Sequence, residues 1–352
     1  MFFRSKKIPL VGLDVTSTSV KLLELSQSGS RCRVEHHTVE PLPPNSVNEK
    51  NISDVDAVAE TIRRALKRSG TKNRNCAMAV SGSAVITKVI TMPSSLGENE
   101  LEAQVQLEAD QYIPYALDEV NLDFEILGST EGNPETVDVL LAASRSENVE
   151  MRVAAAEAAG LTPKVVDVEP YTIENAYILL GDQVPEEGLG KSVALFDIGA
   201  TMTSLEVLND QKMIYTREQA FGGKQLTEEI MRRYGLTYEE AGLAKKEGGL
   251  PDNYVTDVLD PFKETVAQQI SRFLQFYYSA SQTNSVDQIV LAGGCAALPG
   301  IDEMVETRLR IPTNVANPFS RMSTSGRING QNLSDDAPSM MIACGLALRS
   351  FD

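Results

Sequence analysis

The chain of 352 residues contains no tryptophan, two histidines and four cysteines. The cysteines (Cys32, Cys76, Cys295, Cys344) are far apart and the two histidines are neighbours, so neither residue type has the spacing of a zinc site. Cys76, Cys295 and Cys344 lie among small apolar residues, where a free thiol behaves as a small hydrophobic side chain. The sequence therefore predicts reduced cysteines and no zinc.

Positive charge and long apolar runs are also scarce. Asp and Glu number 49 against 32 Lys and Arg, which gives a formal net charge of -17. Such an excess argues against binding nucleic acid or anionic lipid through overall charge. The basic cluster Arg63, Arg64, Lys67 and Arg68 is then expected to be a solvated helix face. Because no run of 18 apolar residues could span a bilayer and residues 1–7 do not begin a secretory signal, we expect a cytosolic chain without direct membrane insertion.

Hydrophobic residues (42%) and charged residues (23%) are in the proportions of a globular protein, and the length allows two or three domains. The first forty residues predict three strands, over 8–15, 19–25 and 31–40. A loop is predicted over 41–51, followed by a helix over 53–69 that is capped by its first residue.

Residues 83–166 predict a separate, smaller unit. A strand, a helix that begins at Ser95 and ends before Pro114, two strands, a second helix and a last strand follow one another. This β-α-β-β-α-β order is that of a small α+β subdomain inserted into the first half. We therefore expect a first domain over 1–82 and 167–190, the insertion over 83–166, and a second domain over 191–352.

The second half restarts as the first half does, with three predicted strands over 193–198, 201–208 and 212–216. A long amphipathic helix is predicted from Asp260, and its aromatic stripe is more often core than a cofactor contact. The polar residues 317–337 are predicted to form a loop.

An internal repeat connects the two halves. GLDVTSTSVKLLEL at 12–25 lies over LFDIGATMTSLEVL at 195–208, which places Asp14 on Asp197. In each copy an apolar strand ends in aspartate, small or hydroxyl residues form the turn, and an alternating strand returns. The pair predicts a duplicated α/β domain, although either copy alone could be an ordinary hairpin with a surface aspartate.

The two turns have the composition of a phosphate-binding site. Small and hydroxyl residues let backbone N–H groups approach phosphate oxygens, and an aspartate at the strand end can hold a hydrated Mg²⁺. Two such turns facing each other would hold a triphosphate from both sides. Three further segments support this site: a glycine pair before a helix at 221–228, a strand and glycine turn at 290–300, and a strand-to-helix junction at 167–171.

In this order the five segments resemble the actin/Hsp70/sugar-kinase superfamily. The position of the insertion, between Val80 and Glu169, resembles the FtsA-like branch. The segment EADQYIPY at 108–115, with residues 17–25 and 197–201, is similar to the PilM family of actin-like type IV pilus assembly proteins. The resemblance implies an α/β actin-like ATPase fold, with duplicated ribonuclease-H-like domains and an inserted α+β subdomain.

The resemblance also implies a set of residues that bind ATP and Mg²⁺. Glu169 corresponds to the acid that positions the attacking water in Hsp70-like relatives, although a carboxylate favoured by the start of a helix is an alternative. Asp14 and Asp197 lie near the Mg²⁺, through water. The remaining residues lie near the phosphates (Thr16, Ser17, Thr18, Ser19, Val20, Lys21, Gly199, Ala200, Thr201), the ribose (Gly223, Lys224, Gln225, Glu228) and the adenine (Gly293, Gly294, Cys295, Pro299).

A partner is implied by the same resemblance: the cytoplasmic N-terminal peptide of PilN, an inner-membrane pilus protein, in a groove beside the insertion. Other platform proteins and motor ATPases are further candidate partners, and a homo-oligomer stays open. The expected function is an ATP-binding cytoplasmic scaffold of type IV pilus assembly and twitching motility, peripheral to the inner membrane through its partners.

The chain departs from the hydrolytic relatives at both turns. Thr16-Ser17 and Ala200-Thr201 stand where those relatives usually carry glycine, and Ser204 stands where many carry a second aspartate. The added side chains crowd close backbone approach, so we expect nucleotide binding with at most slow ATP turnover. A small-molecule kinase is one alternative, which would need a further base. An FtsA-like cell-division protein is another, which would need a basic amphipathic tail.

Overall fold

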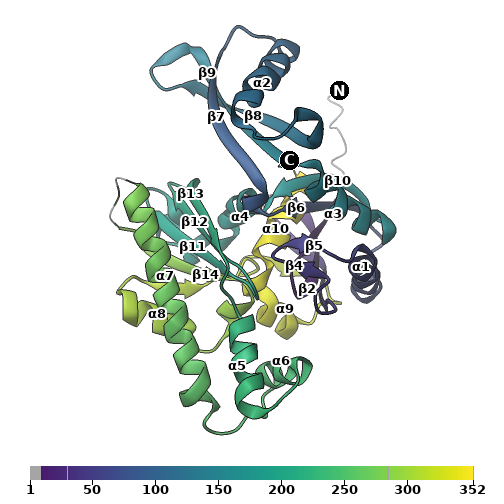
Figure 1. Cartoon of the computed structure of the whole chain (residues 1–352), viewed down its shortest axis with the longest axis vertical. Helices are drawn as coiled ribbons and strands as arrows, with labels where there is room; N and C mark the ends of the chain where they lie inside the picture. The colour runs from purple at the N-terminus through teal and green to yellow at the C-terminus, as the bar shows by residue number, and fades with distance from the viewer. Residues whose placement is uncertain (1–8, 30, 282, 284, 352) are drawn as a thin grey trace.

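The computed structural model describes residues 9–29, 31–281, 283 and 285–351. Three sheets of six, five and three strands organise these residues (Figure 1). The first sheet has the order β10-β6-β1-β2-β3-β16 and the second has the order β13-β12-β11-β14-β15. In both, two antiparallel neighbours follow the central strand on one side, and parallel strands lie on the other. The duplication that the sequence predicts is therefore present in the strand order.

The strands of the first sheet are β1 (Val11–Val15), β2 (Ser19–Ser28), β3 (Arg31–Pro41), β6 (Asn75–Val80), β10 (Thr162–Val168) and β16 (Ser323–Thr324). Those of the second sheet are β11 (Ser192–Ile198), β12 (Thr203–Asn209), β13 (Lys212–Gln219), β14 (Gln288–Ala292) and β15 (Thr313–Val315). The predicted strand over 8–15 thus begins at Val11, and its residue at position 8 lies outside the described chain.

The inserted sheet pairs β7 (Val85–Pro93), β9 (Asn133–Arg145) and β8 (Val120–Thr130), and helix α2 (Glu98–Tyr112) covers one face of it. Strand β10 does not join this sheet. It pairs with β6 in the first sheet, and α3 (Ser146–Ala158) packs against α1 (Val55–Ser69). The expectation that residues 146–166 belong to the insertion does not agree with these pairings, because the insertion completes its own small core with three strands and one helix.

The remaining helices lie around the two large sheets or between them. They are α4 (Glu169–Tyr177), α5 (Lys224–Tyr234), α6 (Tyr238–Glu247), α7 (Asp260–Ala280), α8 (Ile301–Leu309), α9 (Gly330–Asp336) and α10 (Met341–Leu348). Short helical turns are η1 (Gly82–Ala84), η2 (Leu117–Glu119), η3 (Ile178–Gln183), η4 (Pro185–Gly188), η5 (Val255–Leu259), η6 (Gly294–Ala297), η7 (Ala337–Met340) and η8 (Arg349–Phe351). In the described part of the chain, no helix has both the length and the apolar character needed to cross a bilayer.

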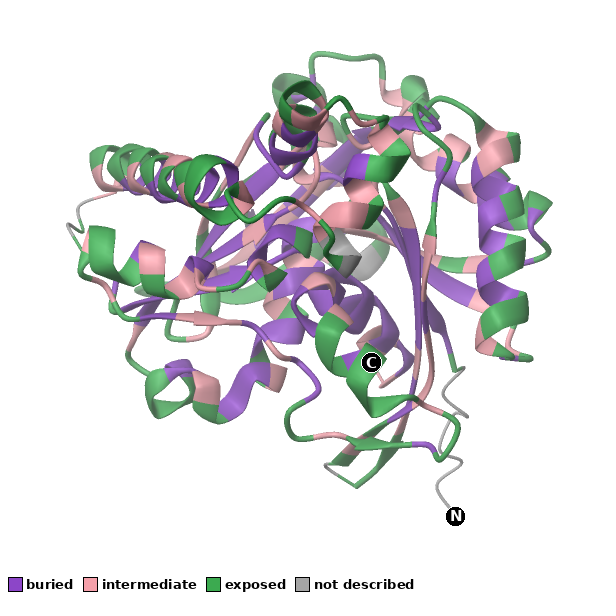
Figure 2. Cartoon of the chain, turned by 90° about the horizontal axis from the view of Figure 1, so that it is seen from below, coloured by how far each residue is buried: buried purple, intermediate pink, exposed green. Residues whose placement is uncertain are grey.

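Helices α4 and α10 lie between the two large sheets and share one core with both (Figure 1). The strands of this region are mostly buried, whereas the outer helices turn exposed faces to solvent (Figure 2). Close packing explains two glycines, because a Cβ at Gly12 would overlap the backbone of Ala343, and one at Gly345 would overlap the backbone of Thr172. The two halves are therefore joined through a common apolar layer.

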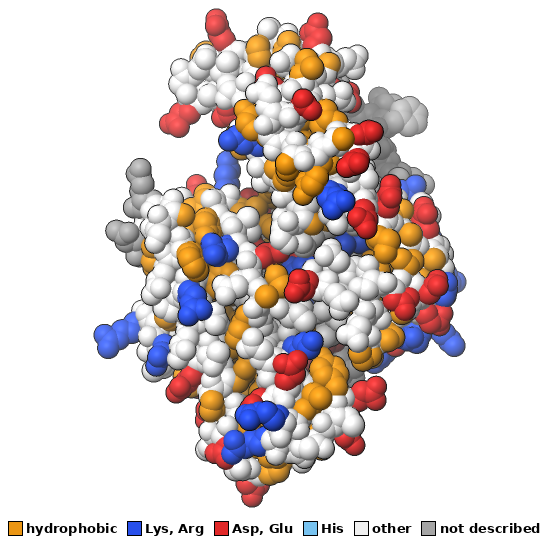
Figure 3. All heavy atoms as spheres, in the orientation of Figure 1, with side chains coloured by type: hydrophobic (Ala, Val, Ile, Leu, Met, Phe, Trp, Pro, Cys, Tyr) orange, Lys and Arg blue, Asp and Glu red, His pale blue; other side chains and the backbone are white. Residues whose placement is uncertain are grey.

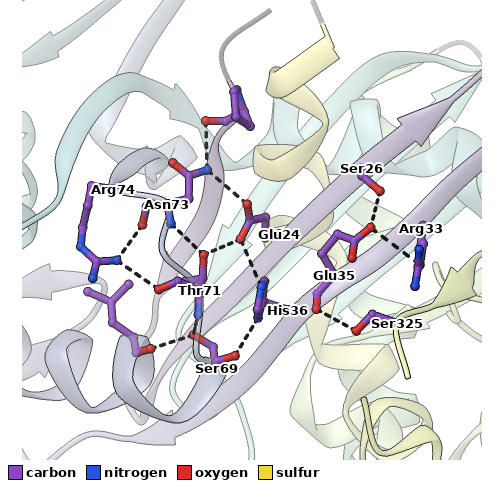
Figure 4. Close-up of polar contacts among 12 residues, drawn as sticks. Glu24, Ser26, Arg33, Glu35, His36, Ser69, Thr71, Asn73, Arg74 and Ser325 are labelled. Atoms are coloured by element: carbon purple, nitrogen blue, oxygen red, sulfur yellow. Dashed lines mark hydrogen bonds and ion pairs between the residues drawn. The ribbon is translucent and has the colours of Figure 1, made fainter. Parts of the chain in front are cut away.

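Strand β16 carries the C-terminal part of the chain back to the first sheet, where it pairs in parallel with β3. The Ser325 hydroxyl donates to the backbone oxygen of Glu35 at 3.2 Å (Figure 4). The same close-up shows Thr71, Asn73 and His36 converging on the Glu24 carboxylate, which fixes the segment after α1 to β2 and β3. The prediction of a loop over 317–337 is wrong in part, because β16 and α9 lie within it.

Three other local predictions are corrected. The helix expected from Ser53 is capped by Asp54, whose carboxylate accepts from the N–H of Ala57 at 2.9 Å. The helix expected from Ser95 begins after Gly97, whose N–H donates to the Glu100 carboxylate at 3.0 Å. The loop expected over 41–51 contains most of a hairpin of two very short strands, β4 (Val47–Asn48) and β5 (Asn51–Ile52).

Candidate nucleotide-binding site between the two halves

The two repeated turns meet across the interface between the halves. β1 and β11 end just after Asp14 and Asp197, and each leads into a turn closed by a backbone hydrogen bond of 2.9 Å. Thr201 Oγ1 in the second turn donates to Ser17 Oγ in the first at 3.1 Å. The structure therefore brings together the two segments that the sequence repeat singles out.

The first turn is stabilised from within by Thr16. Its hydroxyl accepts from the N–H of Thr18 at 3.3 Å and from the N–H of Ser19 at 3.1 Å. These are N–H groups that a phosphate could use, so a phosphate bound there would compete with the hydroxyl. Val20 is buried, while Thr18 is exposed.

Asp14 and Lys21 form a buried ion pair beside this turn. They face each other across β1 and β2, and Lys21 Nζ lies 2.9 Å from Asp14 Oδ2. Lys21 Nζ also donates to the backbone oxygen of Ser339 at 2.7 Å. Burial lowers the pKa of Lys21, but Asp14 and Asp197 outweigh that effect and raise the pKa above its ordinary value. Lys21 is therefore a fixed cation in the interface.

The second half presents carboxylates at the equivalent place. Ser204 faces Asp197 on one side and Glu218 on the other, and its hydroxyl donates to Glu206 Oε2 at 3.2 Å. Glu206 is 1% exposed, and its Oε1 has no hydrogen-bond partner among the described residues. Burial, reinforced by Asp197, raises the pKa of Glu206 well above that of an ordinary carboxyl. Burial also raises the pKa of Asp197, against the opposing effect of Lys21 and Lys50.

Glu169, the first residue of α4, is ion-paired with Lys50, which also lies 3.4 Å from Glu218 Oε1. Burial raises the pKa of Glu169 despite Lys50, and Asp14 adds to the increase. Burial lowers the pKa of Lys50, but Glu169 and Glu218 reverse the direction and raise it. The sequence reasoning missed Lys50 because it placed that residue in a loop.

More carboxylates than cations surround the interface: Asp14, Glu169, Asp197, Glu206 and Glu218 against Lys21, Lys50 and Arg152. Over the residues that the structure describes, no group of three or more Asp, Glu, His or Cys side chains is arranged to hold a metal ion.

The two glycine segments pack against the end of β11. The N–H of Gly223 donates to the Gly199 oxygen at 3.0 Å, and the N–H of Lys224 donates to the Ala200 oxygen at 2.8 Å. Gly293 has φ +83°, and a Cβ there would overlap Asp197. The expected helix start after Gly293 is only the short turn η6. Both segments therefore reach the second of the two repeated turns.

The outer residues of these segments face solvent. Lys224, Gln225 and Glu228 are exposed at the start of α5, as are Gly294 and Pro299 beside η6. Cys295 is buried, and its thiol donates to the Gly199 oxygen at 3.3 Å; burial raises the pKa of this thiol to about 11.

Lys245 on α6 is a further residue that the sequence reasoning did not select. Its Nζ donates to Thr227 Oγ1 on α5 at 2.9 Å, and burial lowers its pKa. A lysine with a depressed pKa beside the glycine-pair helix is a candidate nucleotide contact. No local motif marked it, because α6 reaches the site only through tertiary packing.

The chain is similar to known proteins over almost its whole length. The family model "Type IV pilus assembly protein PilM" matches residues 12–351. A solved PilM-PilN type IV pilus biogenesis complex contains a chain 29% identical to this one, with a TM-score of 0.80 over 98% of this chain and 99% of that one. The cell division protein FtsA of Bacillus subtilis (strain 168) is 22% identical over 88% of this chain and 78% of its own length.

A solved structure of the ethanolamine utilization protein EutJ from Carboxydothermus hydrogenoformans is 17% identical, with a TM-score of 0.58 over 96% of this chain and 89% of that one. At this identity the likeness concerns the fold alone. Together with the closer match, it confirms the predicted α/β actin-like fold.

Proposed function

The chain belongs to the PilM family of type IV pilus assembly proteins, and from that premise we propose that it is an ATP-binding scaffold that holds the cytoplasmic N-terminal peptide of PilN. The observation that carries the nucleotide part is the contact of the two repeated turns, Thr201 to Ser17, at 3.1 Å. Two hydroxyl-rich turns that meet across an interface, with Lys21 beside them, are suited to a polyphosphate.

In this proposal, different residues of the interface contact different parts of the nucleotide. The first turn and Lys21 would contact the phosphates, while Asp14 and Asp197 would hold the hydrated Mg²⁺ that offsets their charge. The segment from Gly223 would lie along the ribose and the segment from Gly293 would lie along the base. Support comes from the hydrogen bonds that pack both segments against the second turn.

Slow turnover is part of the proposal. Glu169, the candidate for positioning water, is already ion-paired with Lys50 in the structure. Thr16 already occupies two N–H groups of the first turn. Both features favour a nucleotide that stays bound, rather than one that is rapidly hydrolysed.

The proposed peptide site is a cavity of about 240 Å³ beside the insertion. Polar side chains line it, among them Asn51, Ser81 and Asn148, and these can pair with the backbone of an extended peptide. Tyr115 and Arg145 add an apolar and cationic wall, with the guanidinium 5.4 Å from the ring centre. A chain of the solved PilM-PilN complex has the fold of this chain, which supports PilN as the partner.

The proposed location is the cytoplasm, at the inner membrane through PilN and with motor ATPases and other platform proteins as further partners. Lys and Arg side chains are scattered over the face in Figure 3 rather than gathered into one basic surface. On this face there is thus no basic patch for anionic lipid headgroups, which is in keeping with attachment through a protein.

Isothermal titration calorimetry with Mg-ATP, and separately with the PilN peptide, tests both parts. We expect both ligands to bind the wild-type protein. Asp197→Ala should abolish Mg-ATP binding and leave peptide binding in place, since Asp197 lies in the nucleotide interface. Asp252→Ala, at an exposed position of the same half, is the matched control. Wild-type protein that binds no Mg-ATP would refute the nucleotide proposal.

A further inference from the structure

The β4–β5 hairpin carries Lys50 at its turn. Asn48 pairs with Asn51, and the two residues between them, Glu49 and Lys50, have φ of 45° and 69°. This left-handed pair is the geometry of a tight hairpin turn, which glycine or asparagine usually adopts. The hairpin is anchored by Val47 and Ile52, which are 3% and 7% exposed. The turn therefore holds Lys50 in a fixed place at some conformational cost.

Lys50 connects three elements that come from both halves. Its ammonium group pairs with Glu169 on α4 and with Glu218 on β13, at 3.4 Å from Glu218 Oε1. Its backbone oxygen accepts from Arg152 Nη2 on α3 at 2.6 Å. Both carboxylate side chains are more than nine-tenths buried, so the ammonium is their main source of compensation from the first half.

The same turn forms a wall of the proposed peptide cavity. Glu49 and Asn51, the neighbours of Lys50 on either side, both line it. Asn148, also in the lining, accepts through its backbone oxygen from Arg152 Nη1 at 3.4 Å. Arg152 Nε donates to the oxygen of Ala79 at 2.6 Å, two residues before the lining residue Ser81. The hairpin turn at Glu49 and Lys50 therefore lies between the cavity and Glu169.

We infer that Lys50 is a positioning residue through which a peptide in the cavity and a nucleotide between the halves change each other's affinity. The inference rests on the proposed function. A peptide that contacts Glu49 and Asn51 bears directly on the Lys50 turn. Any shift of the turn changes the pairing of Lys50 with Glu169 and Glu218, and with it the charge that faces the phosphates. Because coupling of this kind is reciprocal, nucleotide binding changes peptide affinity by the same factor.

The test is calorimetry of the PilN N-terminal peptide with the full-length protein, with and without saturating Mg-ATP. For the wild type we expect the two peptide affinities to differ by about five-fold or more. In Lys50→Met the ratio of the two peptide affinities should fall to about one, even where the affinity for Mg-ATP itself falls. Lys50→Arg, which keeps the charge and can reach both carboxylates, should retain the difference. Lys72→Met, at an exposed position of the same half, is the control.

Glu218→Gln provides a second variant if Lys50→Met does not fold, because it keeps the shape of the side chain and removes one partner of Lys50. It should reduce the ratio of peptide affinities at least two-fold relative to the wild type. An unchanged ratio in Lys50→Met or Glu218→Gln overturns the inference, as does a wild-type ratio of one with both ligands bound. A wild-type protein that fails to bind one of the ligands overturns the proposed function instead, and the inference with it.

Discussion

The two repeated turns have the same backbone hydrogen bond but differ in the charge of the residue that faces each aspartate. Thr16 N–H donates to the Ser19 oxygen, and Gly199 N–H donates to the Met202 oxygen, each at 2.9 Å. Seven residues after each aspartate, however, the first half has Lys21 and the second has Ser204. Asp14 is therefore neutralised within its own half, whereas Asp197 is not.

This difference makes the second half depend on the first. The buried Glu206 and the partly buried Asp197 and Glu218 lie on the second sheet, while Lys21 and Lys50 come from the first half. A duplicated backbone has thus kept its shape while its charges became complementary. Lys21 and Lys50 of the first half therefore attract the carboxylates of the second half, which outnumber the cations beside them.

The largest expected effect is from Lys21→Met, which leaves Asp14 buried without its partner. We expect a loss of about 3–5 kcal/mol in the free energy of unfolding, the usual result of breaking a buried ion pair from one side. Mg-ATP binding should be lost as well. Urea unfolding followed by circular dichroism measures the first effect.

The double variant Asp14→Asn with Lys21→Met sharpens this test, because it removes both charges. It should regain much of the lost stability but no ATP binding. A single Lys21→Met variant as stable as the wild type would show that the pair contributes nothing.

Glu206→Gln tests the acidic side through pH. A carboxyl whose folded pKa lies above its unfolded value of 4.5 stabilises the protein fully below pH 4.5, and this contribution is lost as the pH rises through the folded pKa. We therefore expect Glu206→Gln to gain stability relative to the wild type as the pH rises, by about 1–3 kcal/mol at pH 8. Calorimetric melting at pH 5 and pH 8 measures the trend, with the exposed Glu131→Gln as control. If the stability of Glu206→Gln relative to the wild type were lower at pH 8 than at pH 5, the prediction would be wrong.

Ser204→Lys transfers the charge pattern of the first half to the second. The new ammonium group would face Asp197 and stand where Mg²⁺ is proposed to compensate the carboxylates. We expect the dependence of ATP affinity on Mg²⁺ to shrink by about ten-fold, or about 1.4 kcal/mol. Titrations of ATP with Mg²⁺ and with EDTA measure it, and Ser204→Met controls for the added volume. An equal loss in both variants would assign the effect to crowding.

The smallest expected effect concerns the contact between the turns. Ser17→Ala removes the acceptor of the Thr201 hydroxyl, which is worth about 0.5–1.5 kcal/mol. We expect ATP affinity to fall by roughly two- to ten-fold while the melting temperature changes little. Calorimetry at fixed Mg²⁺ is the measurement. A loss as large as that of Asp197→Ala would mean that the hydroxyl has a larger part than a single hydrogen bond.

Local patterns predicted those parts of the molecule that depend on neighbouring residues. The strand-turn-strand repeat, the glycine segments and the acid at the start of α4 are all visible within short windows of sequence, and the structure brings these segments together. Helix starts were less secure, because Ser53 and Asp54 are both good caps and only the hydrogen bond to Ala57 distinguishes them.

Long-range contacts could not be predicted in this way. Lys50 is separated from Glu169 by 119 residues and from Glu218 by 168. The turn that carries it lacks the glycine or asparagine that announces a hairpin. Ser204 and Glu206 are two residues apart on a predicted strand, so they are expected on one face. That spacing does not show that Glu206 is almost completely buried, which is what raises its pKa. The order of elements predicts that β10 belongs to the insertion, but order alone does not say which sheet a strand joins.

The first sheet also has a consequence for how the protein is made. Its edge strand β16 and the helix α10 that packs on β1 come from the last thirty or so residues of the chain. A nascent chain leaving the ribosome can therefore pair β1, β2 and β3 early, but it cannot complete that sheet before residues 323–348 have been made. The apolar face around Leu23 and Ala77 stays uncovered meanwhile. Until then the first half exposes apolar surface of the kind that makes incomplete domains prone to aggregation.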